Sequence, residues 1–132
     1  MADSVTNTVI YNSPQKAVIS SAFTIDGTEA SVVVGDLSAF TGPNGAALGE
    51  WIVEKIIYHA AGMQLTIAFD ADTDDVIATI SGDGELDFTN NGEFPGFNNP
   101  ESTGFTGDII ATTLNSDAGD TAHLILFLGK KN

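Results

Sequence analysis

Strict alternation of apolar and polar side chains constrains the fold of this chain more than any other feature, and it is clearest between residues 63 and 69. Met63, Leu65, Ile67 and Phe69 are apolar there, and each is separated from the next by a polar or small residue. Successive side chains of an extended strand point to opposite faces, so this period of two places one row in a core and the other in solvent. The segment is therefore predicted to be a half-buried β-strand.

The same composition recurs in short runs along the chain. These runs are rich in Val, Ile, Thr and Phe, and they are bounded by Gly, Asn, Asp and Pro, which is typical of strands joined by turns. Between Lys16 and Asp26, for example, the odd-numbered residues from Ala17 to Ile25 share one face. The other strands predicted in this way are residues 5–12, 29–34, 76–80, 85–88, 109–114 and 122–128.

The dipeptide Asp26-Gly27 is typical of a tight turn between two strands. Because it separates residues 16–26 from residues 29–34, these two strands are predicted to pair as a β-hairpin.

Residues 46–61 fit either a helix or a strand. Leu48, Ile52 and Ile56 recur at helical spacing, but the segment is also rich in β-branched and aromatic residues. Such residues lose rotamer freedom in a helix and pack well on a pleated sheet, so a strand is the favoured interpretation. Trp51, within this apolar run, is predicted to lie in the core.

Length and composition fit one folded domain covering residues 1–132. Eight or nine short strands without a convincing helix predict an all-β fold, a single antiparallel β-sandwich that is either jelly-roll-like or immunoglobulin-like. Residues 1–12 are predicted to form an extended N-terminal arm. The start of the chain lacks the basic and apolar segments of a secretory signal, so the protein is expected to be made and used without export.

Acidic residues dominate the charge and exclude several classes of partner. The chain has eighteen Asp and Glu against four Lys and no Arg, a formal net charge of −14. Binding to phosphates depends on Lys and Arg, so nucleic acid and anionic membrane are both disfavoured as partners. The chain has no cysteine, which removes disulfides, thiolate catalysis and cysteine-based zinc sites.

The acidic turn that holds Asp70, Asp72, Asp74 and Asp75 resembles the opening of a helix-loop-helix calcium loop. The sixth position is Asp75 where that loop needs Gly, and the twelfth is Ser81 where it needs Glu, so the motif is absent. A looser Ca²⁺ site and a solvated turn both stay open, and the solvated turn is favoured. No other cofactor is expected.

A second glycine-rich stretch, residues 82–87, resembles one turn of a calcium-binding β-roll. Such folds stack several consecutive copies, and only one is present. It is interpreted as a turn followed by a strand, with Glu85 and Asp87 facing solvent.

Nothing in the sequence predicts catalysis. His59 and His123 are the only histidines, and each lies inside an apolar run without the spacing of a triad or a metal site. Both are interpreted as strand-face residues, no catalytic residue is assigned, and the protein is expected not to be an enzyme.

Three phenylalanines, Phe94, Phe97 and Phe105, lie in or beside a loop of Gly, Asn and Pro. They either cap the open end of the sandwich or form an exposed contact patch. The first strand offers further candidate contact residues. The proposed contact set is Val5, Val9, Tyr11, Phe94, Phe97 and Phe105.

The chain from residue 50 onward resembles a family of small acidic β-proteins encoded among the virion genes of marine tailed bacteriophages. The resemblance lies in a string of strand and turn residues. Its main segments are Trp51–Tyr58, Phe69–Asp75, Ile80–Gly84, Thr106–Ile109, Gly119–Thr121 and the closing Lys130-Lys131.

This resemblance implies a head decoration, or cement, protein that binds the major capsid protein on the outer surface of the virion after synthesis in the host cytoplasm. It implies a structural role without catalytic residues, and a homo-oligomer, with a trimer favoured. High like charge also suits a protein that must stay dispersed before assembly. The alternative is a carbohydrate-binding module on the virion or tail fibre, which would hold sugars with Phe or Trp faces and acidic side chains.

Overall fold

The computed structural model describes residues 4–24, 31–90, 93, 96–98, 103–114 and 119–131. Within these residues the chain forms eight β-strands and one short 3-10 turn, η1. The strands are β1 Ser4–Asn12, β2 Lys16–Thr24, β3 Ser31–Gly35, β4 Glu50–Phe69, β5 Asp75–Asp87, β6 Phe97–Asn98, β7 Ile109–Leu114 and β8 Thr121–Lys131, and η1 is Leu37–Ala39.

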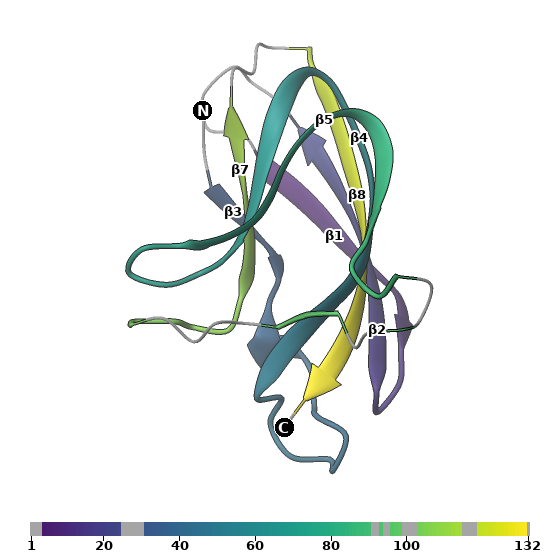
Figure 1. Cartoon of the computed structure of the whole chain (residues 1–132), viewed down its shortest axis with the longest axis vertical. Helices are drawn as coiled ribbons and strands as arrows, with labels where there is room; N and C mark the ends of the chain where they lie inside the picture. The colour runs from purple at the N-terminus through teal and green to yellow at the C-terminus, as the bar shows by residue number, and fades with distance from the viewer. Residues whose placement is uncertain are drawn as a thin grey trace.

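Two layers of antiparallel strands share one long hairpin (Figure 1). The first layer has the order β1-β2-β8-β4-β5, with β8 pairing residues 50–61 of β4. The second layer has the order β3-β7-β4-β5, with β7 pairing residues 64–69 of the same β4. The predicted all-β antiparallel sandwich is therefore confirmed.

The shared hairpin passes from one layer to the other by bending near Gly62. Ala60 pairs with Gly82 and Leu65 pairs with Ile80, so residues 61–64 of β4 face the single residue Ser81 of β5. Unequal strand lengths of this kind bend a ladder without ending it. Gly62 has a φ of 79°, a value that favours glycine.

The sequence pattern separated residues 46–61 from 63–69 and residues 76–80 from 85–88. Both separations are wrong, since β4 continues through Gly62 and β5 continues through residues 81–84. Glycine in these segments permits a bend and a close approach, where the sequence pattern indicated a turn. At Gly84 an added Cβ would lie 2.5 Å from the Tyr58 hydroxyl, so the absent side chain lets Tyr58 lie across β5. Glu85 and Asp87 are exposed, as predicted.

The predicted pairing of residues 16–26 with residues 29–34 is also wrong. Strand β2 pairs with β1 along one side and with β8 along the other, so it has no free side for β3. Strand β3 pairs with β7 in the second layer. The Asp26-Gly27 turn lies outside the described residues.

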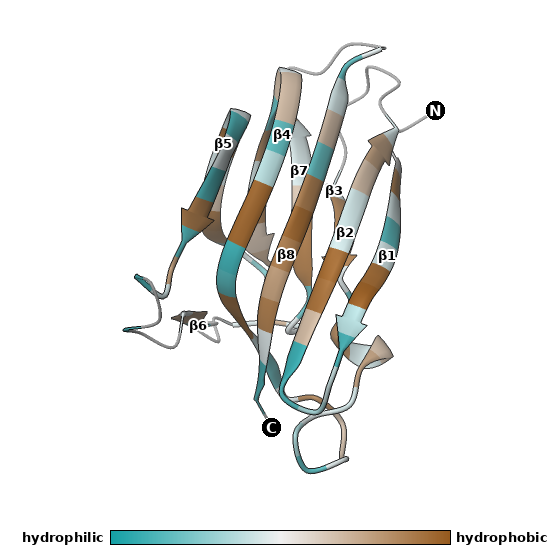
Figure 2. Ribbon diagram, turned by 90° about the vertical axis from the view of Figure 1, so that its right-hand side faces the viewer, coloured by the Kyte–Doolittle hydropathy of each residue, from teal (hydrophilic) through white to brown (hydrophobic). Residues whose placement is uncertain are grey.

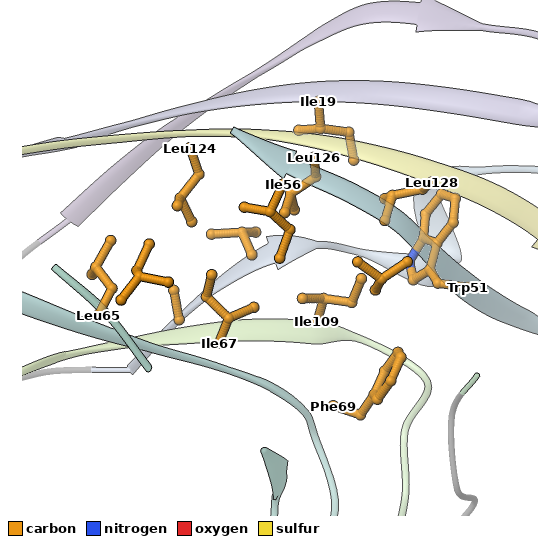
Figure 3. Close-up of a cluster of buried hydrophobic side chains, with 14 of the residues drawn as sticks. Ile19, Trp51, Ile56, Leu65, Ile67, Phe69, Ile109, Leu124, Leu126 and Leu128 are labelled. Atoms are coloured by element: carbon orange, nitrogen blue, oxygen red, sulfur yellow. The ribbon is translucent and has the colours of Figure 1, made fainter. Parts of the chain in front are cut away.

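The core lies between the two layers and consists of the alternating inward residues of each strand (Figure 3). Trp51 is fully buried, as predicted, and its indole Nε1 donates a hydrogen bond of 3.2 Å to the carbonyl of Gly35. The ring of Phe40 meets the indole edge-on, at 4.9 Å between centroids. The largest fully buried side chains are Trp51, Phe69, Ile56, Leu65, Ile67, Ile109, Leu124, Leu126, Leu128, Val34, Val53 and Thr113.

Helical structure is confined to η1 in the described part of the chain. The Asp36 carboxylate caps this turn by accepting a hydrogen bond of 3.0 Å from the backbone N–H of Ser38. None of the described residues forms a helix with the length and hydropathy of a membrane span.

The bend makes a stability prediction. Gly62→Ala should destabilise the fold by about 1–2 kcal/mol because of the left-handed backbone alone. A further loss is expected because the new Cβ would lie 2.5 Å from Oδ1 of Asp120. Urea unfolding of Gly62→Ala, Asp120→Ala and the double variant should give a coupling energy of at least about 0.5 kcal/mol. Gly45→Ala, with a φ of 80° and open space around it, is the control for the backbone term.

Candidate functional site

The two sides of the sandwich differ in charge. Strand β5 ends both layers on one side, and it carries Asp75, Asp83, Glu85 and Asp87. Strand β1 ends the first layer on the other side, pairs with β2 alone among the described strands, and carries no charged residue. Free strand edges invite pairing with other chains, and charges along them oppose it. The β5 edge is therefore protected, and the β1 edge is open.

The second half of β1 is apolar and exposed. The exposed fractions of Val9, Ile10 and Tyr11 are 50, 58 and 53 %. The register of β1 on β2 slips at Ile10, so that Val9 pairs with the buried Ile19 whereas Tyr11 pairs with Val18 on the outer face. This bulge brings Tyr11 onto the outer surface of the first layer.

Apolar side chains continue from Tyr11 across the outer face of the first layer, whose strands β1, β2, β8 and β4 lie side by side in Figure 2. Tyr11 pairs with Val18, and Val18 pairs with Phe127 of β8. In the next row, Ile125 of β8 pairs with Ile57 of β4, which is 38 % exposed. We call these five residues the outer strip: Tyr11, Val18, Phe127, Ile125 and Ile57.

On β5, each row of this face ends in a carboxylate. Ile57 pairs with Glu85, Lys55 pairs with Asp87, and His59 pairs with Asp83. The outer face is thus apolar from Tyr11 to Ile57 and acidic along β5, and the Lys16–Glu54 ion pair lies on the same face beside Val18. A partner that covers it needs an apolar centre and basic groups on one side.

Three of the four lysines are paired with carboxylates of the same chain. Lys16 pairs with Glu54, Lys55 with Glu85 at 2.6 Å and Lys131 with Glu50 at 3.3 Å. The hydrogen bond and the charge of Glu85 raise the pKa of Lys55. The Lys55 ammonium also lies 5.6 Å from the ring centre of Phe127, at the border of the outer strip.

The two histidines lie side by side on this face. His59 and His123 pair across β4 and β8, and both are exposed, which fits their interpretation as strand-face residues. His59 Nδ1 contacts the Asp83 carboxylate, whereas His123 Nε2 lies 2.5 Å from the Ser20 hydroxyl. Asp83 and Ser20 thus contact different histidines. In a catalytic triad a single imidazole contacts both the carboxylate and the hydroxyl.

The acidic turn directs its carboxylates to separate partners. Asp70 accepts a hydrogen bond from the Thr106 hydroxyl at 2.9 Å, and Asp74 accepts one from the backbone N–H of Ala71 at 3.1 Å. Asp72 is exposed, and the backbone N–H of Asp72 donates to the Thr103 carbonyl. Among the described residues no three His, Asp or Glu side chains are grouped to hold a metal ion. The Ca²⁺ prediction for this turn therefore has no support from geometry.

The candidate contact phenylalanines that the structure describes, Phe97 and Phe105, differ in their surroundings and exposure. Phe97 is partly buried and packs on the core, with its ring 6.1 Å from Phe69 and 5.7 Å from Phe88. Phe105 is 40 % exposed. Phe94 lies outside the described residues. Val5 is half-buried, which leaves Val9 and Tyr11 as the exposed candidates on β1.

Of the outer strip, the sequence prediction named Tyr11 and missed the other four residues, although a signal was present. Residues 124–128, Leu-Ile-Leu-Phe-Leu, are apolar at every position, so both faces of β8 are apolar where a half-buried strand has one polar face. The inward residues, including Leu126, fill the core, and Ile125 and Phe127 are left for the outer face.

Comparisons of the chain with protein-family models, with curated proteins and with solved structures find no match. Function must therefore be argued from this surface and its charges.

The carboxylate of Asp108 supports a pH prediction. Partial burial raises its pKa, the charges of Asp36 and Asp70 add to this, and a 2.9 Å hydrogen bond from the backbone N–H of Leu37 opposes it. A folded-state pKa above the unfolded value favours the protonated form on folding. Its contribution is therefore complete at low pH and is lost as pH rises through the folded pKa.

We expect Asp108→Asn, which keeps an acceptor for Leu37, to raise the melting temperature at pH 7, and we expect this gain to vanish towards pH 3. Asp72→Asn, at an exposed position, is the control for general relief of negative charge. An equal gain in the two variants at pH 7 would contradict the prediction.

Proposed function

We propose that this protein is a non-enzymatic adhesion module that binds the outer surface of a virus capsid as a head decoration protein. The observation that carries this proposal is the outer strip, an apolar surface that is exposed at Tyr11 and Ile57 and partly exposed between them. It adjoins the uncharged edge strand β1 on a molecule of net charge −14. Contiguous exposed apolar surface marks an interaction site more often than chance exposure. The resemblance of residues 50–131 to virion proteins makes the capsid shell the first partner to test.

The geometry of the strip suits a protein surface as partner. Tyr11, Val18, Phe127, Ile125 and Ile57 come from four adjacent strands and face the same way, so they form a broad surface without a cleft of their own. A stable protein interface buries about 800 Å² on each partner, with aromatic residues near its centre. Tyr11 and Phe127 supply aromatic rings for such a centre.

The negative charge contributes to specificity. The carboxylates of Asp83, Glu85 and Asp87 border the strip on the β5 side, so two copies placed face to face repel each other unless the rows are offset. A shell protein with basic groups opposite β5 is attracted instead. The same charge disfavours binding to packaged DNA.

Strand β1 gives the proposed contact a second component. Residues 4–12, which were predicted as an arm, belong to the chain's own sheet, and their free edge is open to a strand from the shell. A trimer stays a prediction. Three strips on one trimer would gain occupancy on a symmetric shell through effective concentration.

The carbohydrate-binding alternative relied on Phe or Trp rings that can stack on a sugar, and Trp51 is not available for this. Trp51 is fully buried, and among the described aromatic residues Tyr11 and Phe105 are exposed. Selective binding of the wild-type protein on a glycan array, without binding to shells, would favour that alternative.

Binding to shells assembled from the major capsid protein of the same genome tests the proposal. Ile57→Ser and Tyr11→Ser each remove exposed apolar area from the strip, so we expect each to weaken shell binding at least about tenfold, a loss of about 1.4 kcal/mol. Occupancy is measured by co-sedimentation and by density on imaged particles.

Val76→Ser is the matched control, because Val76 is 57 % exposed and apolar but lies on β5. We expect this variant to bind as the wild type does. All three variants should keep the wild-type circular dichroism spectrum. Unchanged binding of Ile57→Ser and Tyr11→Ser, or absence of wild-type binding, would overturn the proposal.

A further inference from the structure

Lys130 occupies a position that the fold reserves for an apolar residue. On β8 the inward residues Ala122, Leu124, Leu126 and Leu128 are all buried, and Lys130 is the next residue in this row. It is 8 % exposed and pairs across the sheet with the fully buried Trp51. A charged group this deeply buried is costly unless something compensates it.

The compensation for Lys130 differs from that of the other lysines. Its ammonium bonds to the side-chain oxygen of Asn12 and lies 5.4 Å from the ring centre of Phe40. No carboxylate of the described residues forms an ion pair with it, whereas Lys16, Lys55 and Lys131 each have one. Desolvation by burial lowers the pKa of Lys130, which agrees with a charge that lacks a counterion.

A cavity of about 400 Å³ lies at this group. Its lining comes from the β1–β2 turn, the loop that precedes β4 and the end of β8. These segments lie together at one end of the sandwich (Figures 1 and 2). Its volume is within the range of small-ligand sites. The lining residues are Asn12, Ser13, Pro14, Thr41, Gly42, Pro43, Gly45 and Lys130.

The lining is suited to an anion. Lys130 is its sole charged residue, and the Asn12 carboxamide and the Thr41 hydroxyl are hydrogen-bond donors of the same lining. The β1–β2 turn is fixed by the Ser13 hydroxyl oxygen, which accepts a 3.1 Å hydrogen bond from the backbone N–H of Lys16. The opposite wall is fixed by a 2.7 Å hydrogen bond from Gly42 N–H to the carbonyl of Ala46. The backbone of both walls is therefore held by hydrogen bonds within the chain.

We propose that this cavity is a binding site for a carboxylate group, which Lys130 holds as its counterion while Asn12 and Thr41 donate further hydrogen bonds. The inference does not depend on the outer strip. The carboxylate comes either from a free organic acid or from an Asp or Glu side chain of a partner chain, and the two sources share the same chemistry at Lys130.

The test is a titration of the isotopically labelled protein, followed by amide chemical shifts at constant ionic strength. Sodium acetate should produce saturable shifts at Ser13, Thr41, Gly42 and Lys130. Acetamide, which has nearly the same shape without the charge, should not. N-acetyl-aspartyl-amide represents a partner's side chain, so binding as tight as that of acetate assigns the site to a protein partner, and exclusion of this probe assigns it to a free acid.

Lys130→Met keeps the aliphatic stem and removes the charge, and we expect it to weaken acetate binding at least tenfold. Lys131→Met, which changes the net charge equally at an exposed lysine, should bind acetate as the wild type does.

Melting temperatures distinguish a ligand-binding role of Lys130 from a purely structural one. A binding role predicts that Lys130→Met is at least as stable as the wild type, whereas a purely structural bond to Asn12 predicts a loss of stability. Equal shifts from acetate and acetamide, or unchanged acetate affinity in Lys130→Met, overturn the proposal.

Discussion

The fold depends on one constraint, the bend of the β4–β5 hairpin around the core. Because β4 pairs with β8 before Gly62 and with β7 after it, a single 20-residue strand holds the two layers in register with each other. The inward residues Ile56 and Leu65, on either side of the bend, are both fully buried in the same core. The hairpin closes one side of the sandwich covalently. Among the described strands, β1 and β3 are therefore the outermost strands on the other side.

The distribution of charge follows from this arrangement. Strand β5 alternates between exposed and buried or part-buried residues, and its exposed carboxylates Asp83, Glu85 and Asp87 oppose pairing with other chains. Strand β1 has no such protection, although the Asn7 side chain joins its first half to the second layer by donating a 2.9 Å hydrogen bond to the carbonyl of Val33. The second half of β1 lies beyond this bond and carries Ile10 and Tyr11 into solvent. Adhesion is therefore favoured on one side of the molecule and opposed on the other.

Alternation along the sequence predicted the sandwich and most of its strands because one buried face per strand is a local property. The inward face of β2, a strand within residues 46–61 and the burial of Trp51 were all predicted in this way, although the observed strand begins at Glu50. Strand pairing was not, because both sides of β2 are occupied, and one of its two partners, β8, is about a hundred residues away along the chain. The role of two glycines was ambiguous for a related reason, because Gly62 and Gly84 both look like turns in the sequence. In the structure the strand continues through each of them. Gly62 lies at the bend beside Asp120, and Gly84 makes room for the Tyr58 side chain across β5.

The surface departs from what a minimal sandwich requires, and the departures indicate function. A two-layer sandwich needs one apolar face per strand, yet β8 presents Ile125 and Phe127 outward, and its inward row ends in Lys130. Apolar residues on the outer face, Ile125 and Phe127, lower solubility, and the net charge of −14 offsets this effect. Lys130 in the inward row lowers the stability of the fold, because its ammonium is buried without a carboxylate partner among the described residues. Residues that break the local rules of a fold at a cost are the expected location of binding sites, and here both departures lie on β8, the strand that joins β2 to β4.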